Sequence, residues 1–276
     1  MSNISADGMQ DAEGRQYHIG LAPGEVAPMV MMVGDPHRAT RVSKRFDSVR
    51  VERSCREYTS YTGTHEGLEL TVLGTGIGSD NTEIAVQELL HCVEKPTLLR
   101  VGSSGGLREE AKIGHVVVST GAVRLESTSL GFVQEGYPAV AHHEVVLAAI
   151  TAAERAGHPY HVGLTATAAG FYGWQGRTDQ PIKSRHAGLP AELGERNVLN
   201  MEMEASTLLT MGTLAGIRAG CVCAVFGNRF ENRFAEHDEK YAAEARAIDI
   251  GLGALHVLAE MDAAAGGGRF HLPARS

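Results

Sequence analysis

The sequence predicts an α/β domain with a largely parallel or mixed sheet, and three observations support this fold class. The chain has 276 residues, which is enough to bury a large core. Short β-rich runs alternate along it with segments of helical periodicity. Between residues 15 and 262 no repeat, low-complexity linker or break in composition divides the chain. We therefore expect one domain over residues 15–262, with flexible tails at 1–14 and 263–276.

The first third of the domain predicts mostly strands. An apolar run at residues 30–33 stops at a Gly-Asp-Pro turn, and a helical pattern follows at 38–46. Residues 50–52, 58–64 and 68–73 are β-rich, and a His-Glu-Gly turn joins the last two.

The rest of the domain alternates helices and strands. Apolar residues recur at helical spacing over residues 82–93, and residues 97–101 and 115–120 are β-rich and adjoin glycines. The same patterns predict a helix at 143–156, a strand at 160–166, a helix at 203–215, a strand at 219–226 and a closing helix at 236–261. In such folds ligands gather where strands end in loops, and the polar motifs of this chain stand at those ends.

Composition excludes several classes of function. The formal net charge of -8 argues against non-specific binding to nucleic acids or anionic membranes, which needs a basic face. No apolar run approaches the roughly 20 residues that span a bilayer. The N-terminal segment is polar, unlike a secretory signal, so we expect a cytoplasmic protein. The four cysteines form no Cys-x-x-Cys pair and the 13 histidines form no convincing ligand pattern, so we expect no metal in the site.

Residues 171–179, Phe-Tyr-Gly-Trp-Gln-Gly-Arg-Thr-Asp, place an amide and a guanidinium among rings and glycines. Gln175 offers a donor and an acceptor, and Arg177 offers a rigid fork of donors. Together they can read a planar edge of alternating polarity, such as O4, N3–H and O2 of uracil. Phe171 supplies a stacking surface. Alone, the segment is more typical of an ordinary polar loop.

Two motifs predict an anion site. Residues 34–38, Gly-Asp-Pro-His-Arg, follow a predicted strand and open a predicted helix. The N–H groups at the start of that helix and the charge of Arg38 can attract an anion. A plain turn with a surface arginine explains the motif equally well. Arg100 ends an apolar strand and needs an anion or a carboxylate as partner. Ser103 and the glycines after it predict a loop wrapped around phosphate. The Walker and dinucleotide signatures are missing, which argues against ATP or NAD.

Residues 200–205, Asn-Met-Glu-Met-Glu-Ala, predict a sugar site. Glu204 can accept two hydrogen bonds from vicinal hydroxyls, as on a ribose, and Met203 can pack on the apolar face of the sugar. Acidic residues are also common at helix N-termini, and for this motif alone we prefer that simpler interpretation. Arg56 and His18 are weaker candidates. Phosphate, ribose and base are the three parts of a nucleoside phosphorolysis complex.

Seven motifs, in this order, resemble the nucleoside phosphorylase-I family, and within it the uridine phosphorylases, over about residues 17–261. The motifs begin at Tyr17, Gly34, Cys55, Thr75, Arg100, Phe171 and Asn200. The resemblance implies a three-layer α/β sandwich around a mixed, partly barrel-like sheet, with residues 15–262 as the single phosphorylase domain. It also implies a homo-oligomer whose sites are shared across a dimer interface. Bacterial members are commonly hexamers, which we expect here, and some relatives are dimers.

The resemblance also implies roles for individual residues. Phosphate would be bound by Gly34, Arg38, Arg100 and Ser103, with Arg56 of the partner subunit. Met203 and Glu204 would hold the ribose hydroxyls, and His18 of the partner subunit would approach the 5′-hydroxyl. Gln175 and Arg177 would bind uracil and stabilise its developing charge as catalytic residues, with Phe171 and Phe226 beside the base.

The chain departs from its relatives at several positions. Bacterial uridine phosphorylases commonly have Gly-Pro-Ser where residues 79–81 are Ser-Asp-Asn, and that serine binds a potassium ion with the glutamate matching Glu57. The sequence therefore leaves open whether potassium binds here. Trp174 and Phe226 leave the volume of the base pocket open. Purine-preferring relatives have an aspartate where residues 227–228 are Gly-Asn, which favours a pyrimidine.

The expected function is reversible phosphorolysis of uridine, with deoxyuridine and thymidine as further candidate substrates. Inorganic phosphate is the co-substrate, and no cofactor is expected. Three alternatives stay open: a purine nucleoside phosphorylase, a nucleoside hydrolase on the same fold, and a catalytically silent nucleoside-binding protein.

Overall fold

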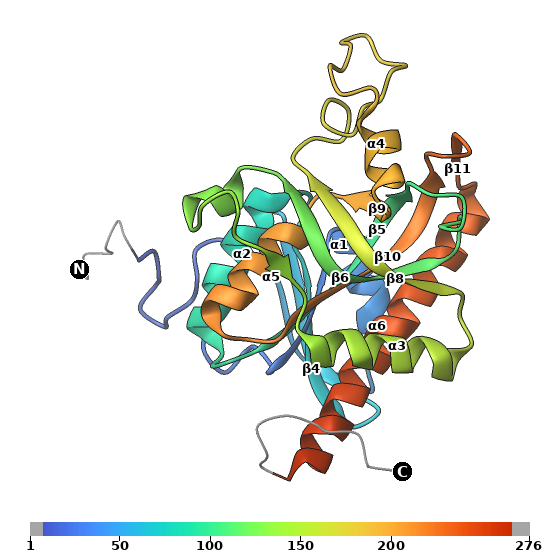
Figure 1. Cartoon of the computed structure of the whole chain (residues 1–276). Helices are drawn as coiled ribbons and strands as arrows, with labels where there is room; N and C mark the ends of the chain where they lie inside the picture. The colour runs from blue at the N-terminus through green and yellow to red at the C-terminus, as the bar shows by residue number, and fades with distance from the viewer. Residues whose placement is uncertain (1–7, 267–276) are drawn as a thin grey trace.

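A closed ring of five strands forms the centre of the computed structural model, which describes residues 8–266. In the ring β5 (Thr97–Gly106) pairs with β10 (Ala219–Asn228), and β10 pairs with β6 (Val116–Leu125). The ring closes through β8 (Tyr160–Ala168) and β9 (Val198–Glu202), since β9 pairs with β5. The expected mixed, barrel-like sheet is confirmed (Figure 1).

The sheet continues beyond β5 on one side. Its further strands, in spatial order, are β1 (Met29–Val33), β4 (Leu68–Gly74), β3 (Tyr58–His65) and β2 (Ser48–Cys55). The pairs β5–β1 and β1–β4 are parallel, whereas β4, β3 and β2 form an antiparallel meander. Two short strands complete the sheet, β7 (Ala139–Val140) against β6 and β11 (Arg233–Phe234) against β10.

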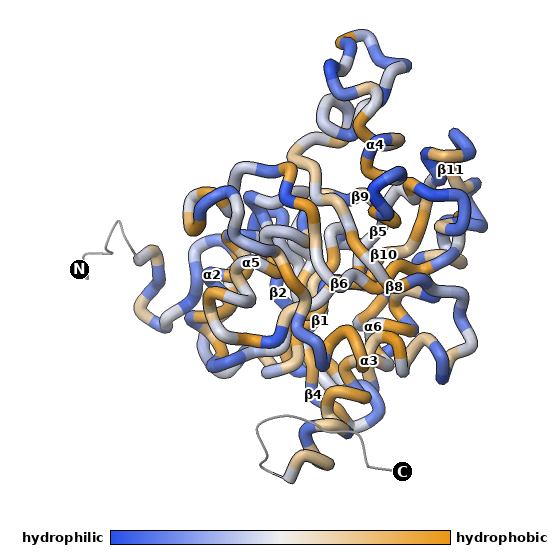
Figure 2. The backbone as a smooth tube through the Cα atoms, in the orientation of Figure 1, coloured by the Kyte–Doolittle hydropathy of each residue, from blue (hydrophilic) through white to orange (hydrophobic). Residues whose placement is uncertain are grey.

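Helices cover both faces of this sheet and create the three layers. They are α1 (Pro36–Ser43), α2 (Ser79–Cys92), α3 (His143–Ala156), α4 (Leu189–Glu195), α5 (Ala205–Ala215), α6 (His237–Ala265) and the 3-10 turn η1 (Thr128–Gly131). Strand β1 shows why both faces need cover. Its residues alternate between two buried cores, Met31 on the side of α6 and Met32 on the side of α5. In Figure 2 apolar residues follow the central strands and the facing sides of α3 and α6.

Every helix and strand that the sequence predicts has a counterpart, but several boundaries were wrong. Strand β5 continues through Ser103 to Gly106, so the expected phosphate loop is a strand. The physical reason is barrel closure, because β5 pairs with β10 on one edge and with β9 on the other. The helix expected from residue 203 begins at Ala205, and Glu202 ends β9.

The sequence patterns missed α4, β7, β9, β11 and η1. All five are short, and the 5-residue β9 is polar enough to resemble a helix start. At the N-terminal end, Gln10 of the expected tail forms a β-bridge with Gln16 of the expected domain. At the other end, α6 runs to Ala265, beyond the expected boundary at 262. The rest of both expected tails, residues 1–7 and 267–276, lies outside the described residues. Within residues 8–266 no helix combines the length and the apolarity that a bilayer span requires.

Candidate active site

One cavity of about 950 Å³ lies where several strand ends meet, and its size suits a small organic ligand. Its wall combines the β1–α1 turn, β5, the segment after β8, the β9–α5 junction and the end of β10. Ten residues that the sequence singled out line it: Gly34, Arg38, Arg100, Ser103, Phe171, Gln175, Arg177, Met203, Glu204 and Phe226. Arg38 and Arg100, far apart in the sequence, therefore face one shared space.

Arg38 is held rigidly in this wall. Its Nε donates to Glu244 Oε2 at 2.8 Å and its Nη1 donates to the carbonyl of Val101 at 3.1 Å. Both Arg38 and Glu244 are buried, and Glu244 also pairs with Arg41. Carbonyl and carboxylate thus fix the guanidinium of Arg38, and a second carboxylate, Asp35, pairs with Arg41 at 2.8 Å.

Arg100 sits between two carboxylates. Its Nε donates to Glu202 at 3.0 Å and its Nη2 donates to Glu204 at 2.5 Å. Burial works against the charged form, but Glu204 and Glu202 outweigh it and raise the pKa of Arg100 well above its usual value. The carboxylate partner expected for this buried arginine is therefore present. Gly102 makes room for it, since a Cβ there would lie 2.6 Å from Arg100 Nη2.

Glu202 and Glu204 differ in their tasks. Glu202 accepts hydrogen bonds from Thr167 Oγ1 at 2.6 Å and from the backbone N–H groups of Glu204 and Ala205, so it fastens the start of α5. Glu204 accepts from Gly78 N at 2.7 Å, and it borders the cavity beside Met203. Burial raises the pKa of Glu204, opposed by the charge of Arg100.

The two serines of β5, Ser103 and Ser104, differ in their hydrogen bonds. The hydroxyl of Ser104 donates to the carbonyl of Ala224 at 3.2 Å and accepts from Asn200 at 2.9 Å, which commits it to the structure. Ser103 lines the cavity as Ser104 does, but its hydroxyl has no hydrogen-bond partner within residues 8–266.

Gln175 and Arg177 line the same cavity. Gln175 is only 5% exposed, yet no residue between 8 and 266 hydrogen-bonds to its side-chain amide. The Nε of Arg177 donates to the carbonyl of Phe171 at 3.0 Å, and the guanidinium lies 3.8 Å from the Phe171 ring centroid. A buried amide and a stacked guanidinium that line one cavity can hydrogen-bond to a polar ligand.

The sequence patterns missed Arg229, which follows β10. Its Nη1 donates to the carbonyl of Gln175 at 2.9 Å and its Nη2 to that of Gly176 at 3.3 Å, so it anchors the loop that carries Gln175. Burial, and next the charge of Arg229, lower the pKa of Arg177. No carboxylate in the described part of the chain pairs with either arginine. The sequence does contain a signal for Arg229, because this arginine follows an apolar run, the same feature that singled out Arg100.

Phe226 and Trp174 are the two rings whose effect on the cavity the sequence left open. Phe226 is buried in the wall, with Arg38 at 6.0 Å and Lys240 at 5.6 Å from its ring centroid. Trp174 stacks on His186 with centroids 4.4 Å apart and is not part of the wall. Neither ring fills the cavity.

His18 and Arg56 do not line the cavity of their own chain. The ring of His18 is held by Glu88, with Nδ1 2.6 Å from Oε1. Arg56 is exposed in a left-handed turn (φ 52°), and its Nη1 lies 3.3 Å from the Tyr17 hydroxyl. The next residue, Glu57, does border the cavity. Both candidates thus belong to a second cluster around Tyr17.

Comparison with known proteins agrees with this geometry. Residues 28–253 match the Phosphorylase superfamily. The chain is similar to the uridine phosphorylase of Thermococcus kodakarensis, with 43% identity over 94% of this chain and 92% of the relative. It is 36% identical to the uridine phosphorylase of Klebsiella aerogenes over 85% of this chain and 94% of the relative. The crystal structure of uridine phosphorylase from Vibrio fischeri ES114 has a TM-score of 0.80 and 27% identity, covering 91% of this chain and 99% of that one.

Proposed function

The chain belongs to the phosphorylase superfamily, and we propose that it catalyses the reversible phosphorolysis of uridine to uracil and α-D-ribose 1-phosphate. It is thus a pentosyltransferase of pyrimidine salvage, with inorganic phosphate as co-substrate and no cofactor. Deoxyuridine and thymidine are further candidate substrates. One observation carries the proposal: one cavity is lined by two arginines fixed by salt bridges, a buried carboxylate, a buried amide that has no hydrogen-bond partner among residues 8–266, and a third guanidinium stacked on a ring.

Phosphate occupies the end formed by Arg38, Arg100 and Ser103. The salt bridges that fix the two guanidiniums support this role, because pre-oriented donors bind an anion without losing side-chain freedom. The hydroxyl of Ser103 and the backbone at Gly34 complete the seat.

Glu204 accepts hydrogen bonds from the ribose hydroxyls, and Met203 packs against the sugar. The carboxylate is buried and fixed by Gly78 and Arg100, so it presents its remaining acceptor capacity in one direction. Arg100, which is proposed to hold phosphate, thus also pairs with the carboxylate that is proposed to hold ribose.

Uracil lies against Gln175 and Arg177, between Phe171 and Phe226. As phosphate oxygen attacks C1′ and the N1–C1′ bond breaks with inversion, the bonding electrons move onto the base. Arg177 and Gln175 stabilise that charge at the carbonyl oxygens, where it exists only in the transition state. Burial, and next the charge of Arg229, lower the pKa of Arg177, and this supports the role because negative charge on the base offsets both unfavourable effects. Uracil then takes a proton from water.

The active unit in this proposal contains two copies of the chain or more, and a hexamer is our expectation. His18 and Arg56 both lie outside the cavity and near Tyr17, in one surface cluster. A partner subunit that applies this cluster to the cavity would add His18 at the ribose and Arg56 at the phosphate. The four free thiols support a reducing, cytoplasmic location.

Three features weigh against the alternatives. A hydrolase has no need of guanidiniums fixed beside C1′, whereas a phosphorylase does. Purine-preferring relatives have an aspartate at the position where this chain has Gly-Asn. The Nδ2 atom of Asn228 donates at 3.0 Å to the carbonyls of both Arg108 and Ala111. Its amide is therefore committed to the backbone. The open cavity favours an enzyme over a silent binding protein.

An absorbance assay of uridine, thymidine, deoxyuridine, inosine and guanosine, each with and without phosphate, tests the proposal. We expect uracil and ribose 1-phosphate from uridine only when phosphate is added. Equal turnover without phosphate would identify a hydrolase. Faster turnover of a purine nucleoside would identify a purine enzyme, and binding of uridine without products would identify a silent relative.

A further inference from the structure

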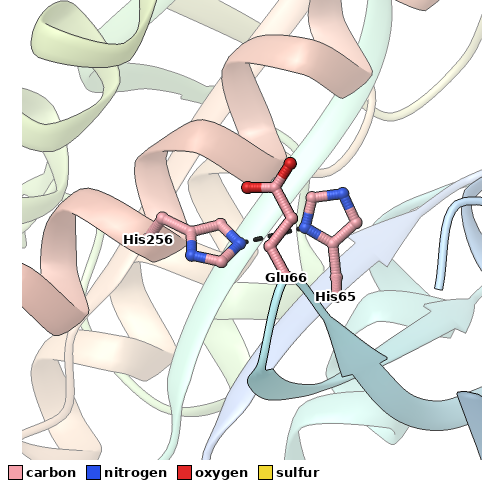
Figure 3. Close-up of side chains that lie close together, drawn as sticks. All are labelled: His65, Glu66 and His256. Atoms are coloured by element: carbon pink, nitrogen blue, oxygen red, sulfur yellow. Dashed lines mark hydrogen bonds between the residues drawn. The ribbon is translucent and has the colours of Figure 1, made fainter. Parts of the chain in front are cut away.

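A second cluster of metal-binding side chains lies away from the cavity, between a hairpin and the last helix. His65 ends β3, Glu66 follows in the β3–β4 turn, and His256 comes from α6. Figure 3 shows the three side chains pointing toward one another from these two elements. Their ligand atoms all lie within 4.8 Å of one another, and none of the three residues borders the cavity.

The two imidazoles have a separation that suits one ion. His65 Nδ1 lies 2.9 Å from His256 Nε2, a distance that also suits the hydrogen bond between them. Two nitrogens that are each about 2.05 Å from a tetrahedral zinc ion are about 3.3 Å apart, roughly 0.4 Å more than this separation. The rings therefore need little movement to become neighbouring ligands. The carboxylate of Glu66 is exposed and can close the remaining gap by a change of rotamer.

The hairpin turn fixes this arrangement. His65 pairs with Leu68, so the loop is Glu66–Gly67 alone, and both residues have positive φ, 48° and 80°. A two-residue turn of this kind normally has Asn or Gly at its first position, and Glu there is unusual. Asp47 accepts a hydrogen bond from Gly67 N at 3.1 Å and steadies the turn.

The surroundings also suit a cation. Both histidines are half-buried and Glu66 is exposed, which leaves open positions for water on one side. Two imidazoles and one carboxylate are a donor set of zinc and of neighbouring divalent transition metals.

We propose that His65, Glu66 and His256 form a binding site for one divalent transition-metal ion of the zinc class. The ion replaces the hydrogen bond between the rings. The ring that donates this hydrogen bond gives up its proton to solvent and takes one on its other nitrogen, so that the protons stand on His65 Nε2 and His256 Nδ1. The ion joins two elements that are 191 residues apart in the chain, so its role is structural: binding free energy stabilises the contact between the β3–β4 hairpin and α6.

Calorimetric titration of tag-free, chelator-treated protein with Zn²⁺ tests the site directly. We expect one ion per chain for the wild type. His65→Ala and His256→Ala should each weaken binding roughly 100-fold or more, because loss of outer partners alone costs 10–100-fold in affinity. Glu66→Gln should weaken it less and alter the visible spectrum of bound Co²⁺. Zn²⁺ should also raise the Tm of the wild type by several degrees and leave the Tm of His256→Ala unchanged.

His161→Gln is the matched control. His115 Nδ1 and His161 Nε2 lie 2.8 Å apart, a similar pair, but in the part of the chain that the structure describes no carboxylate or thiol completes a three-ligand group there. This variant should bind Zn²⁺ like the wild type. No Zn²⁺ bound by the wild type, or equal binding by His256→Ala, would overturn the proposal. Glu66→Gln keeps it testable if a histidine variant fails to fold, because Glu66 is on the surface.

Discussion

The Nη2 atom of Arg100 lies 2.5 Å from Oε2 of Glu204 in the wall of the cavity. This contact joins the arginine proposed to hold phosphate to the carboxylate proposed to hold ribose. Removing either partner would leave a buried, unpaired charge, which costs stability as well as function. The sharpest tests therefore change residues around this pair.

Arg177→Ala should lower kcat by roughly 10²-fold or more, because it removes a donor that acts mainly on the charge of the transition state. Steady-state assays with uridine measure this. Arg185 stands in the same loop, outside the cavity wall, and Arg185→Ala should keep kcat. Near-normal turnover of Arg177→Ala would reject its catalytic role.

Arg38→Ala should raise the KM for phosphate by roughly tenfold or more, because a charge-assisted contact contributes about 1.5–3 kcal/mol. The protein should still fold, since Arg41 keeps Glu244 paired. The comparison is Arg45→Ala, which removes an exposed pair with Asp249. An unchanged phosphate dependence in Arg38→Ala would show that phosphate binds elsewhere.

Gly102→Ala should lower kcat/KM by roughly 10²-fold without touching a polar group. The new Cβ would lie 2.6 Å from Arg100 Nη2 and 2.9 Å from Cys223 Sγ, so the guanidinium must move, and misplacement by about 1 Å can cost that much. Gly136→Ala is the control, because nothing lies within 4 Å of a Cβ there. Wild-type kinetics in Gly102→Ala would mean that the position of Arg100 is not critical.

Asn228→Asp should destabilise the protein and give no turnover of inosine. The substitution sets a carboxylate oxygen against two carbonyl oxygens that now accept hydrogen bonds, at a cost of about 1–3 kcal/mol or more. Urea unfolding measures the cost. Asn197→Asp should be nearly neutral, because Asn197 acts as an acceptor for Arg108. Gain of inosine turnover would show that position 228 alone selects the base.

The free energy of unfolding should decrease as the pH is lowered, in part because of the His115–His161 pair. Burial, and next the charge of His161, lower the pKa of His115 from 6.5, so below about pH 6.5 the unfolded chain binds more protons. The contribution is complete above that pH and is lost as the pH falls through the lowered folded value. In urea unfolding with a chelator present, His115→Gln should lose less stability than the wild type between about pH 7.5 and about pH 5.5. His91→Gln, exposed on α2, should behave as the wild type; identical slopes for all three would contradict the prediction.

Much of the fold could be predicted because its cause is local. The run that forms β1 is apolar throughout and the run that forms β10 has no polar side chain before Asn228, which marks strands buried on both faces. The end of β5 could not be predicted, since Ser103 to Gly106 have weak strand preference and become a strand through partners more than 90 residues away. Arg229 was missed for a similar reason, because its role depends on a loop 54 residues earlier.

The sequence alone determined the chemistry: which residues can hold an anion, a diol and a planar base, and which segments form the longer strands and helices, because these follow from residue type and near neighbours. Only the tertiary structure decided where that chemistry operates. It brought Arg38 and Arg100 to one cavity, placed His18 and Arg56 outside it, and set His65 against His256. These placements depend on closure of the barrel and on packing between distant segments, which no local pattern encodes.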